Sequence, residues 1–308
     1  MLNCRRLLGN CLNKIDMELQ VILLGKHRFR NLLNINKKNG KLICRNGFVL
    51  NFNKANHHNI KDLFYFSLLD GVLLSNKRGH WNYKKGIITT PQEIKFDIKT
   101  FDKFIFAETF LYDIHFSDFN LNNKIVIQAG GFTGDTALYY ADRGANVYSF
   151  EPNPESYNLA LLNLNLNPDL ARRIIFKNLA IDKDRIIEFY IDKYNSGGSS
   201  AYDNGGKKIV NVRSVSINTI LSEFNIKDPY LLDIDIKGSE FEIINEDSLS
   251  KFKMIRIEYT AKIGNITLGK REAIIKRLKQ LGFKNIRIYK HNNGSYDLIE
   301  HGTIEAKK

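Results

Sequence analysis

The pattern of apolar and polar positions changes near residue 100 of this 308-residue chain. Before that point, apolar residues in 1–33 recur at helical spacing, which predicts one or two amphipathic helices. Residues 36–53 and 71–90 read as short strands joined by turns. Farther along, short apolar runs alternate with helical patterns. The sequence therefore predicts a small α+β extension over residues 1–100 and a larger α/β domain over residues 101–308.

The larger domain reads as strands that alternate with helices. Strands are expected in the apolar run that ends before Glu151 and at residues 125–127, 174–180, 186–191, 210–214, 230–236 and 254–259. Helices are expected after the glycines near residue 130 and at residues 105–116, 155–167, 216–224, 241–249 and 270–281. Residues 286–289 and 296–300 form a closing pair of strands. The alternation predicts a doubly wound, mainly parallel Rossmann-like sheet with an antiparallel C-terminal edge.

A glycine-rich turn follows the first expected strand of this domain. From residue 125 the chain reads Ile-Val-Ile-Gln-Ala-Gly-Gly-Phe-Thr-Gly, which places Gly130, Gly131 and Gly134 ahead of a helical pattern. Such glycines allow a sharp turn and let a ligand approach the main chain closely. The next strand ends in Glu151, where a carboxylate can accept hydrogen bonds from ribose hydroxyls. This order indicates a site for a nucleoside-bearing ligand, and the alternative is a turn that binds no ligand.

Five further motifs follow the turn in order. They are Glu151-Pro-Asn-Pro, Asn178-Leu-Ala-Ile-Asp, Asn195-Ser-Gly-Gly-Ser-Ser, Val215-Ser-Ile-Asn-Thr-Ile-Leu and Leu231-Leu-Asp-Ile-Asp-Ile-Lys-Gly-Ser-Glu-Phe-Glu. With the turn, the series resembles the FkbM family of S-adenosylmethionine-dependent methyltransferases over roughly residues 105–290. Members of that family carry Asp-x-Gly-Ala-Asn-x-Gly, Phe-Glu-Pro-Asn-Pro, Asn-Ser-Gly-x-Ser-Ser and Ile-Asp-x-Glu-Gly-Ala-Glu in series. Two positions differ, because Gln128 stands where the family usually has an acid and Lys237 where it usually has Glu.

The resemblance implies a methyltransferase fold and a site for S-adenosylmethionine at the glycine turn. The family commonly uses its first acid near the amino-acid part of the cofactor, at the position of Gln128. Asp182 is expected to approach the adenine amino group, and the alternative is an ordinary turn acid. The predicted cofactor-binding residues are Gln128, Gly130, Gly131, Phe132, Thr133, Gly134, Glu151, Asn153 and Asp182.

Acids at the ends of the fourth and fifth strands are the candidates for catalysis. Asp235 lies near the end of an apolar run, where the sheet directs it toward the ligand, and a carboxylate there can orient or deprotonate a substrate hydroxyl. The alternative is a cap on the turn into the next helix. Glu258 ends the fifth strand and is expected on the substrate side. Asp233 faces the same side of its strand as Asp235, and its expected role is structural, with a buried partner.

Composition narrows the choice of partners and of compartment. Residues 1–124 hold 20 Lys and Arg against 10 Asp and Glu, and residues 125–308 hold 26 against 23, within a formal charge of +13. The basic extension fits either a polyanionic partner or an ordinary lysine-rich surface. Cys4, Cys11 and Cys44 lack paired metal spacing, which fits reduced thiols in a cytoplasmic protein with no metal site. No apolar run approaches the roughly 20 residues that span a bilayer.

Three functions remain after these observations. The resemblance implies an S-adenosylmethionine-dependent O-methyltransferase that acts on a hydroxyl of a sugar, a glycan or another small metabolite. An RNA methyltransferase would use the basic extension for phosphate contacts. A non-catalytic binding protein would keep the fold without the reaction. We expect the first, with nucleic acid as a less favoured partner, and the apolar face of residues 1–33 leaves a second subunit as a further candidate partner.

Overall fold

The computed structural model describes residues 41–43, 49–51, 81–106, 109–110, 120–191, 208–236, 239–263, 266–290 and 299–308. The chain divides into two compact units, residues 1–119 with 165–167 and residues 120–164 with 168–308. The domain boundary near residue 100 stays a prediction. Outside the described residues lie the helices expected in 1–33, most of the helix expected at 105–116, the motif at 195–200, Lys237 and the three cysteines.

The described part of the first unit consists of short elements around an aromatic cluster. Its elements are β1 (Lys41–Ile43), β2 (Val49–Asn51), β3 (Asn82–Lys84), β4 (Ile87–Thr89), β5 (Lys95–Asp97), the 3-10 helix η3 (Ile98–Thr100) and α5 (Lys103–Phe106). The strands β3, β4 and β5 form an antiparallel sheet. The ring of Phe106 lies 4.9 Å from that of Phe96 and 5.5 Å from that of Phe110, between centroids. Aromatic burial of this kind stabilises the described part of this unit.

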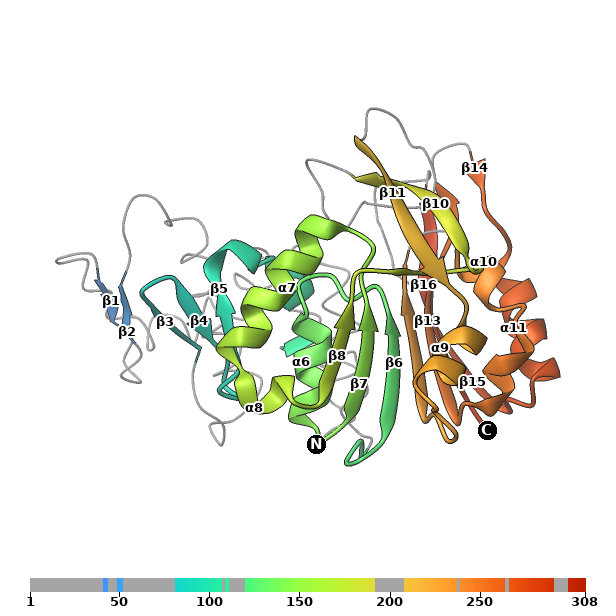
Figure 1. Ribbon diagram of the computed structural model, residues 1–308, viewed down its shortest axis with the longest axis horizontal. Coiled ribbons are helices and arrows are strands. Elements are labelled where there is room, and N and C mark those ends of the chain that lie inside the picture. Colours follow the sequence, from blue (N-terminus) through green and yellow to red (C-terminus); the bar gives the residue numbers. More distant parts are fainter. Residues whose placement is uncertain are drawn as a thin grey trace, which may run out of the picture. The chain divides into compact units, whose positions relative to one another are not determined.

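Within its described residues, the second unit is built on an eight-stranded sheet with the order β15-β16-β13-β12-β6-β7-β8, and β14 pairs with β13 (Figure 1). The strands are β6 (Ile125–Ala129), β7 (Asn146–Phe150), β8 (Ile174–Lys177), β12 (Leu231–Asp235), β13 (Met254–Ile263), β14 (Ile266–Thr267), β15 (Asn285–Lys290) and β16 (Ile299–Lys307). Neighbours from β8 to β13 run parallel, and β16 is antiparallel to both β13 and β15. The predicted doubly wound sheet with an antiparallel C-terminal edge is confirmed.

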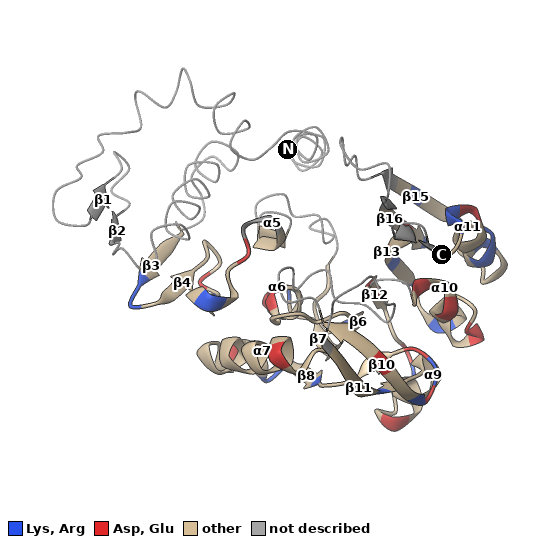
Figure 2. Cartoon of the chain, turned by 90° about the horizontal axis from the view of Figure 1, so that it is seen from above, with Lys and Arg blue, Asp and Glu red and all other residues tan. Residues whose placement is uncertain are grey.

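Helices cover both faces of this sheet, with α9, α10 and α11 on one side and α6 on the other (Figure 2). The helices are α6 (Asp135–Asp142), α7 (Pro154–Leu166), α8 (Pro168–Ala171), α9 (Ile217–Glu223), α10 (Glu240–Ile243), the 3-10 helix η6 (Asp247–Lys251) and α11 (Arg271–Gln280). The main core joins Ile127 and Ile257 of the sheet to Ile220 of α9 and Ile274 of α11. None of the helices in the described ranges is long and apolar enough to cross a membrane.

The strand expected at residues 174–180 is divided in the structure. β8 ends at Lys177, and β9 (Ala180–Ile181) joins a second sheet with β11 (Lys208–Val215) and β10 (Arg185–Ile191). Between them, Asn178 Nδ2 donates to the backbone oxygens of Glu151 and Pro152, at 2.8 and 3.1 Å. A side chain that bonds neighbouring backbone competes with the strand ladder, and the chain turns away from the main sheet there.

The helix expected at residues 241–249 is also divided, into α10 and η6. Glu246 lies between the two pieces, and its carboxylate accepts hydrogen bonds from Ile217 N and Asn218 N at the start of α9, each at 3.1 Å. This carboxylate satisfies amides that the first turn of a helix leaves unpaired. Glu246, at the break between α10 and η6, therefore caps the beginning of α9.

The face of the sheet opposite the main core carries a row of polar side chains. In register across five strands stand Ser149, Gln128, Asp233, Arg256 and Glu305. Each is at most 2% exposed. Alternate strand residues share a face, so the next residues on this face toward the carboxyl ends of β12 and β13 are also polar. The polar face therefore leads directly to the edge where the candidate site lies.

Candidate active site

The glycine turn brings the end of β6 against the end of β12. Gly130 adopts φ +88°, and a Cβ on it would lie 1.9 Å from the backbone oxygen of Asp235. The amides of Gly130 and Gly131 donate to Phe150 O at 3.0 and 2.9 Å, which joins the turn to β7 as well. Another residue at Gly130 would carry both backbone strain and a clash. The turn is thus fixed among the carboxyl ends of three adjacent strands.

The side chain of Glu151 points to the glycine turn. Its Oε2 accepts a hydrogen bond from Phe132 N and its Oε1 one from Asn153 N, both at 2.8 Å. Phe132 adopts a left-handed conformation, with φ +44°, inside the turn. The predicted juxtaposition of acid and turn is therefore present, and each oxygen keeps a further lone pair for a ligand hydroxyl.

Burial changes the protonation of this acid. It raises the pKa of Glu151 to about 7, although the hydrogen bonds from Asn153 and Phe132 favour the charged form, and the negative charge of Asp135 raises it further. Near neutral pH the carboxyl is therefore divided between its two forms. A ligand that donates hydrogen bonds to Glu151 would favour the charged form.

Gln128 uses both ends of its amide inside the protein. Its Oε1 accepts from Ser149 Oγ at 2.8 Å, and its Nε2 donates to Gly130 O at 3.3 Å. A carboxylate at this position would lose the donor to Gly130 and would stand in register beside the buried Asp233. The amide of Gln128 therefore makes contacts that a carboxylate at this position could not make. A contact between Gln128 and a cofactor stays a prediction.

Asp182 has one oxygen paired and one oxygen free of a hydrogen bond. Its Oδ2 accepts from Arg185 Nη2 at 2.6 Å. Its Oδ1 is buried, and among the described residues no group hydrogen bonds to it. A buried acceptor without a partner is uncommon in folded proteins and calls for a donor that is not yet bound. An amino group of a ligand has the required chemistry.

Two other predicted cofactor residues take part in the local backbone structure. Asn153 Oδ1 accepts from Glu155 N at 3.0 Å and so caps the first turn of α7. The carbonyl oxygen of Thr133 accepts from Asn163 Nδ2 at 2.8 Å, which ties the turn to the same helix. These contacts shape the turn, and binding of a cofactor by either residue stays a prediction.

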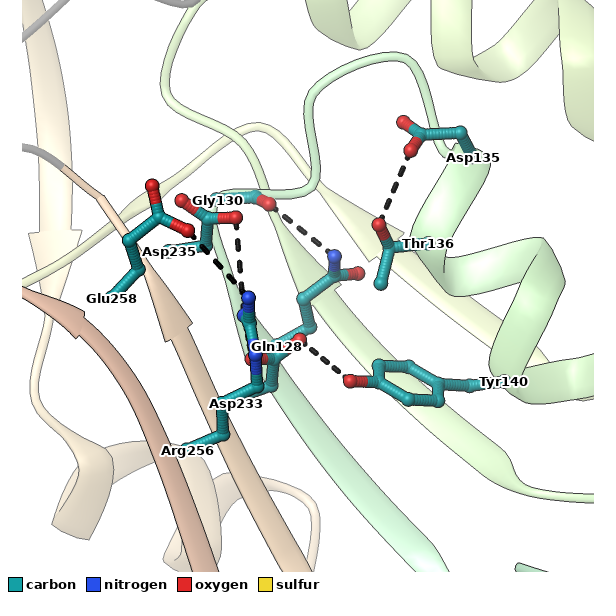
Figure 3. A network of polar contacts seen from close by, with 9 residues as sticks. All are labelled: Gln128, Gly130, Asp135, Thr136, Tyr140, Asp233, Asp235, Arg256 and Glu258. Atoms are coloured by element: carbon teal, nitrogen blue, oxygen red, sulfur yellow. Dashed lines mark hydrogen bonds and ion pairs between the residues drawn. The ribbon is translucent and has the colours of Figure 1, made fainter. Parts of the chain in front are cut away.

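The two predicted catalytic acids stand side by side at the carboxyl ends of β12 and β13. Asp235 pairs in register with Glu258, and both side chains share the face that carries the polar row (Figure 3). The side chain of Asp235 is 41% exposed and that of Glu258 is 22% exposed. They are thus the part of this polar face that a substrate can reach. Their role in catalysis stays a prediction.

Asp233 has the buried partners that its position requires. Tyr140 Oη donates to its Oδ2 at 2.8 Å and Arg256 Nη1 donates to its Oδ1 at 2.8 Å (Figure 3). Burial, together with the negative charge of Asp233, holds the pKa of Tyr140 well above its ordinary value, so its hydroxyl remains a donor. The expectation of a partnered acid at Asp233 is confirmed.

Arg256 is the polar residue that sequence reasoning missed. Its side chain is 1% exposed, Nη1 lies 3.9 Å from Asp235 Oδ2, and Nη2 lies 3.6 Å from Glu258 Oε2. Burial disfavours its charge, but the charge of Asp233 and then those of Asp235 and Glu258 outweigh this and raise the pKa of Arg256 above its ordinary value. The sequence did contain a sign of this residue. Arg256 interrupts the apolar run of β13 two positions before Glu258, so the two side chains lie on the same face of the strand.

Within the described residues, no group of three or more His, Cys, Asp or Glu side chains is arranged to hold a metal ion. At the acid pair the nearby cation is the guanidinium of Arg256.

A doubly wound sheet with a glycine turn after β6 and an acid after β7 is the arrangement of a Rossmann-like α/β protein. The model of the methyltransferase FkbM domain matches residues 125–284. The chain belongs to this family of methyltransferases. No curated protein matched the chain.

Solved structures of low sequence identity share parts of this architecture. TYW2 of M. jannaschii, solved in complex with AdoMet, is 13% identical, with 77% of this chain and 88% of that chain covered and a TM-score of 0.41. The METTL16 MTase domain is 12% identical, with coverages of 93% and 91% and a TM-score of 0.41. Precorrin-6y C5,15-methyltransferase from Geobacter metallireducens is 14% identical, with coverages of 61% and 82% and a TM-score of 0.34. None of these likenesses bears on the substrate.

Proposed function

We propose that this protein uses S-adenosylmethionine to methylate a hydroxyl of a sugar, a glycan or another small metabolite. The observation that carries the proposal is the carboxylate of Glu151 held against the glycine turn, 2.8 Å from Phe132 N. Membership of a methyltransferase family supports the reaction class. The choice of a hydroxyl acceptor follows from the acid pair, Asp235 and Glu258, because carboxylates accept hydrogen bonds from hydroxyls and can take up their protons.

The residues around the turn suit the chemical groups of S-adenosylmethionine. Glu151 would accept hydrogen bonds from the two ribose hydroxyls, as an acid after the second strand does in nucleoside sites. Asp182 Oδ1, which is buried without a hydrogen bond among the described residues, would accept one from the adenine amino group. When bound, the cofactor would supply the methyl carbon that the acceptor oxygen attacks, with S-adenosylhomocysteine as the leaving group.

The acid pair would act on the acceptor. Asp235 is the more exposed of the two acids and would take up the proton of the reacting hydroxyl. Glu258 would accept a hydrogen bond from a neighbouring hydroxyl and so orient the acceptor. The predicted domain division would leave this chemistry to residues 101–308, with the basic extension outside it.

Substitution of Glu151 by alanine is expected to weaken binding of S-adenosylhomocysteine by at least about tenfold, because two charge-assisted hydrogen bonds are lost. Isothermal titration calorimetry on both proteins measures this. Glu155→Ala is the matched control, since this exposed acid lies four residues farther along and faces solvent. Absence of saturable binding by folded wild-type protein would contradict the proposal.

Binding of S-adenosylhomocysteine is expected to strengthen by about tenfold between pH 6 and pH 8. With the pKa of Glu151 raised to about 7, the acid is mostly protonated at pH 6, and its proton must leave before the ribose hydroxyls can donate to a carboxylate. By the same linkage, the free protein loses stability as pH rises through about 7, because its folded state favours the protonated form. A Glu151→Gln variant should show a flat profile, and an equally steep profile in that variant would assign the effect to another group.

The acceptor can be found by incubation with a methyl donor labelled on its methyl group. Separate glycan, lipid and RNA fractions are supplied, and the fraction that gains label is recorded. Label in neutral or acidic glycans supports the proposal. Label in RNA would favour the alternative of an RNA methyltransferase. Saturable cofactor binding without label in these fractions or in a small-metabolite fraction would favour a binding protein that has lost the reaction.

A further inference from the structure

We infer that Arg256 is a positioning residue that holds Asp235 and Glu258 side by side as a charged pair, and that it is itself held by Asp233 and Tyr140. The inference rests on the proposed function, because the pair matters as the place where an acceptor hydroxyl binds. Through Tyr140, this arrangement connects the pair to α6, the helix that begins at the glycine turn (Figure 3).

The two acids need a nearby cation in order to be charged together. Asp235 and Glu258 are register partners on neighbouring parallel strands, and such strands lie about 4.8 Å apart. Two carboxylates at this spacing repel, and without compensation one of them takes up a proton more readily. The acid that acts as the base must be charged, and a charged neighbour accepts a stronger hydrogen bond from the acceptor than a neutral one does.

Arg256 lies beneath both acids and keeps donors available for them. Its two terminal nitrogens lie 3.9 Å from Asp235 and 3.6 Å from Glu258, distances that give electrostatic attraction without a full hydrogen bond. Among the described residues, no group accepts a hydrogen bond from Nε or Nη2. Because the guanidinium is buried, solvent and salt screen its charge little. One cation thus lies close to two partly buried carboxylates.

The guanidinium is itself fixed from the other side. Asp233 accepts from Nη1 at 2.8 Å and is anchored by the Tyr140 hydroxyl at its second oxygen. On β16 the register partner of Arg256 is Glu305, which pairs with Lys307 at 3.2 Å. Among the described residues, these contacts and registers place Tyr140 from α6, two acids from β12, Glu258 on its own strand and Glu305 from β16 around Arg256.

Two variants test this role, so that the test remains possible if one of them does not fold. Arg256→Lys keeps a charge, but a single ammonium cannot contact Asp233, Asp235 and Glu258 together. Asp233→Asn with Arg256→Gln removes both charges of the buried pair and leaves neither unpaired. The side-chain carboxyl carbons of 13C-labelled protein are titrated by NMR, and binding of S-adenosylhomocysteine is measured in parallel.

In the double variant, the titration midpoint of Asp235 is expected to rise by about one pH unit or more, with a smaller rise in Arg256→Lys. Affinity for S-adenosylhomocysteine should stay within about twofold of wild type. With a labelled acceptor fraction in hand, the acidic limb of the pH–rate profile should move in the same direction.

Arg277→Gln is the matched control, since this arginine of α11 bonds Asp247 and two backbone oxygens away from the acid pair. It should not move the Asp235 midpoint. An unchanged Asp235 midpoint in folded Arg256→Lys and in the double variant would overturn the inference and leave Arg256 as a structural residue. Failure of wild-type protein to bind S-adenosylhomocysteine would count against the proposed function. The titration would still test whether Arg256 stabilises the charged acid pair.

Discussion

Replacement of Asp233 by alanine is expected to lower the free energy of unfolding by about 3–5 kcal/mol. The substitution leaves Arg256, 1% exposed, without the carboxylate that it contacts at 2.8 Å. It also leaves the buried Tyr140 hydroxyl without its acceptor. An uncompensated buried charge costs far more than a lost surface contact. Denaturant unfolding followed by circular dichroism measures the change, and a fall in Tm of roughly 10 °C should accompany it.

Two controls bracket this effect. Tyr140→Phe removes one hydrogen bond to a charged group and should cost about 1.5–3 kcal/mol. Asp228→Ala removes a solvent-exposed acid that lies 3.4 Å from Lys253, and it should change stability by less than about 1 kcal/mol. If Asp233→Ala were no more destabilising than Asp228→Ala, the buried pair would not contribute to the stability of this fold.

The order of strands and helices could be predicted because the chain encodes it locally. The apolar run at β6, the glycines that follow and the helical spacing of α7 and α11 each depend on residues close in sequence. The split of the third strand could not be predicted in this way. It depends on Asn178 reaching the backbone of Glu151, a contact across 27 positions. Apolar pattern alone does not report such a bond.

The candidate site could likewise be predicted only in part. The approach of Glu151 to the glycine turn follows from topology, because adjacent parallel strands end at one edge. The internal bonding of Gln128 depends on Ser149, which lies opposite it in the sheet. Arg256 was missed because a single sequence does not give the register that sets it against Asp233. The expectation that a buried Asp233 needs a partner could have pointed to Arg256.

Replacement of Asp235 by asparagine is expected to lower turnover by about 10²–10⁴-fold, the usual contribution of a positioned acid or base. Asparagine keeps the size of the side chain but cannot take up the proton of the acceptor hydroxyl. Affinity for S-adenosylhomocysteine should stay within about twofold, since the proposed contacts to the cofactor come from Glu151 and the turn. Initial rates with a labelled methyl donor, compared with calorimetric binding, separate the two effects.

Glu258→Gln provides the comparison within the same acid pair. The glutamine can still accept a hydrogen bond from a hydroxyl, so KM for the acceptor is expected to rise several-fold while kcat falls less than in Asp235→Asn. The opposite ranking would make Glu258 the base and Asp235 the orienting residue. Weak cofactor binding with normal turnover at saturation in Asp235→Asn would move that acid to the cofactor side, which is feasible because Gly130 lies against its backbone oxygen.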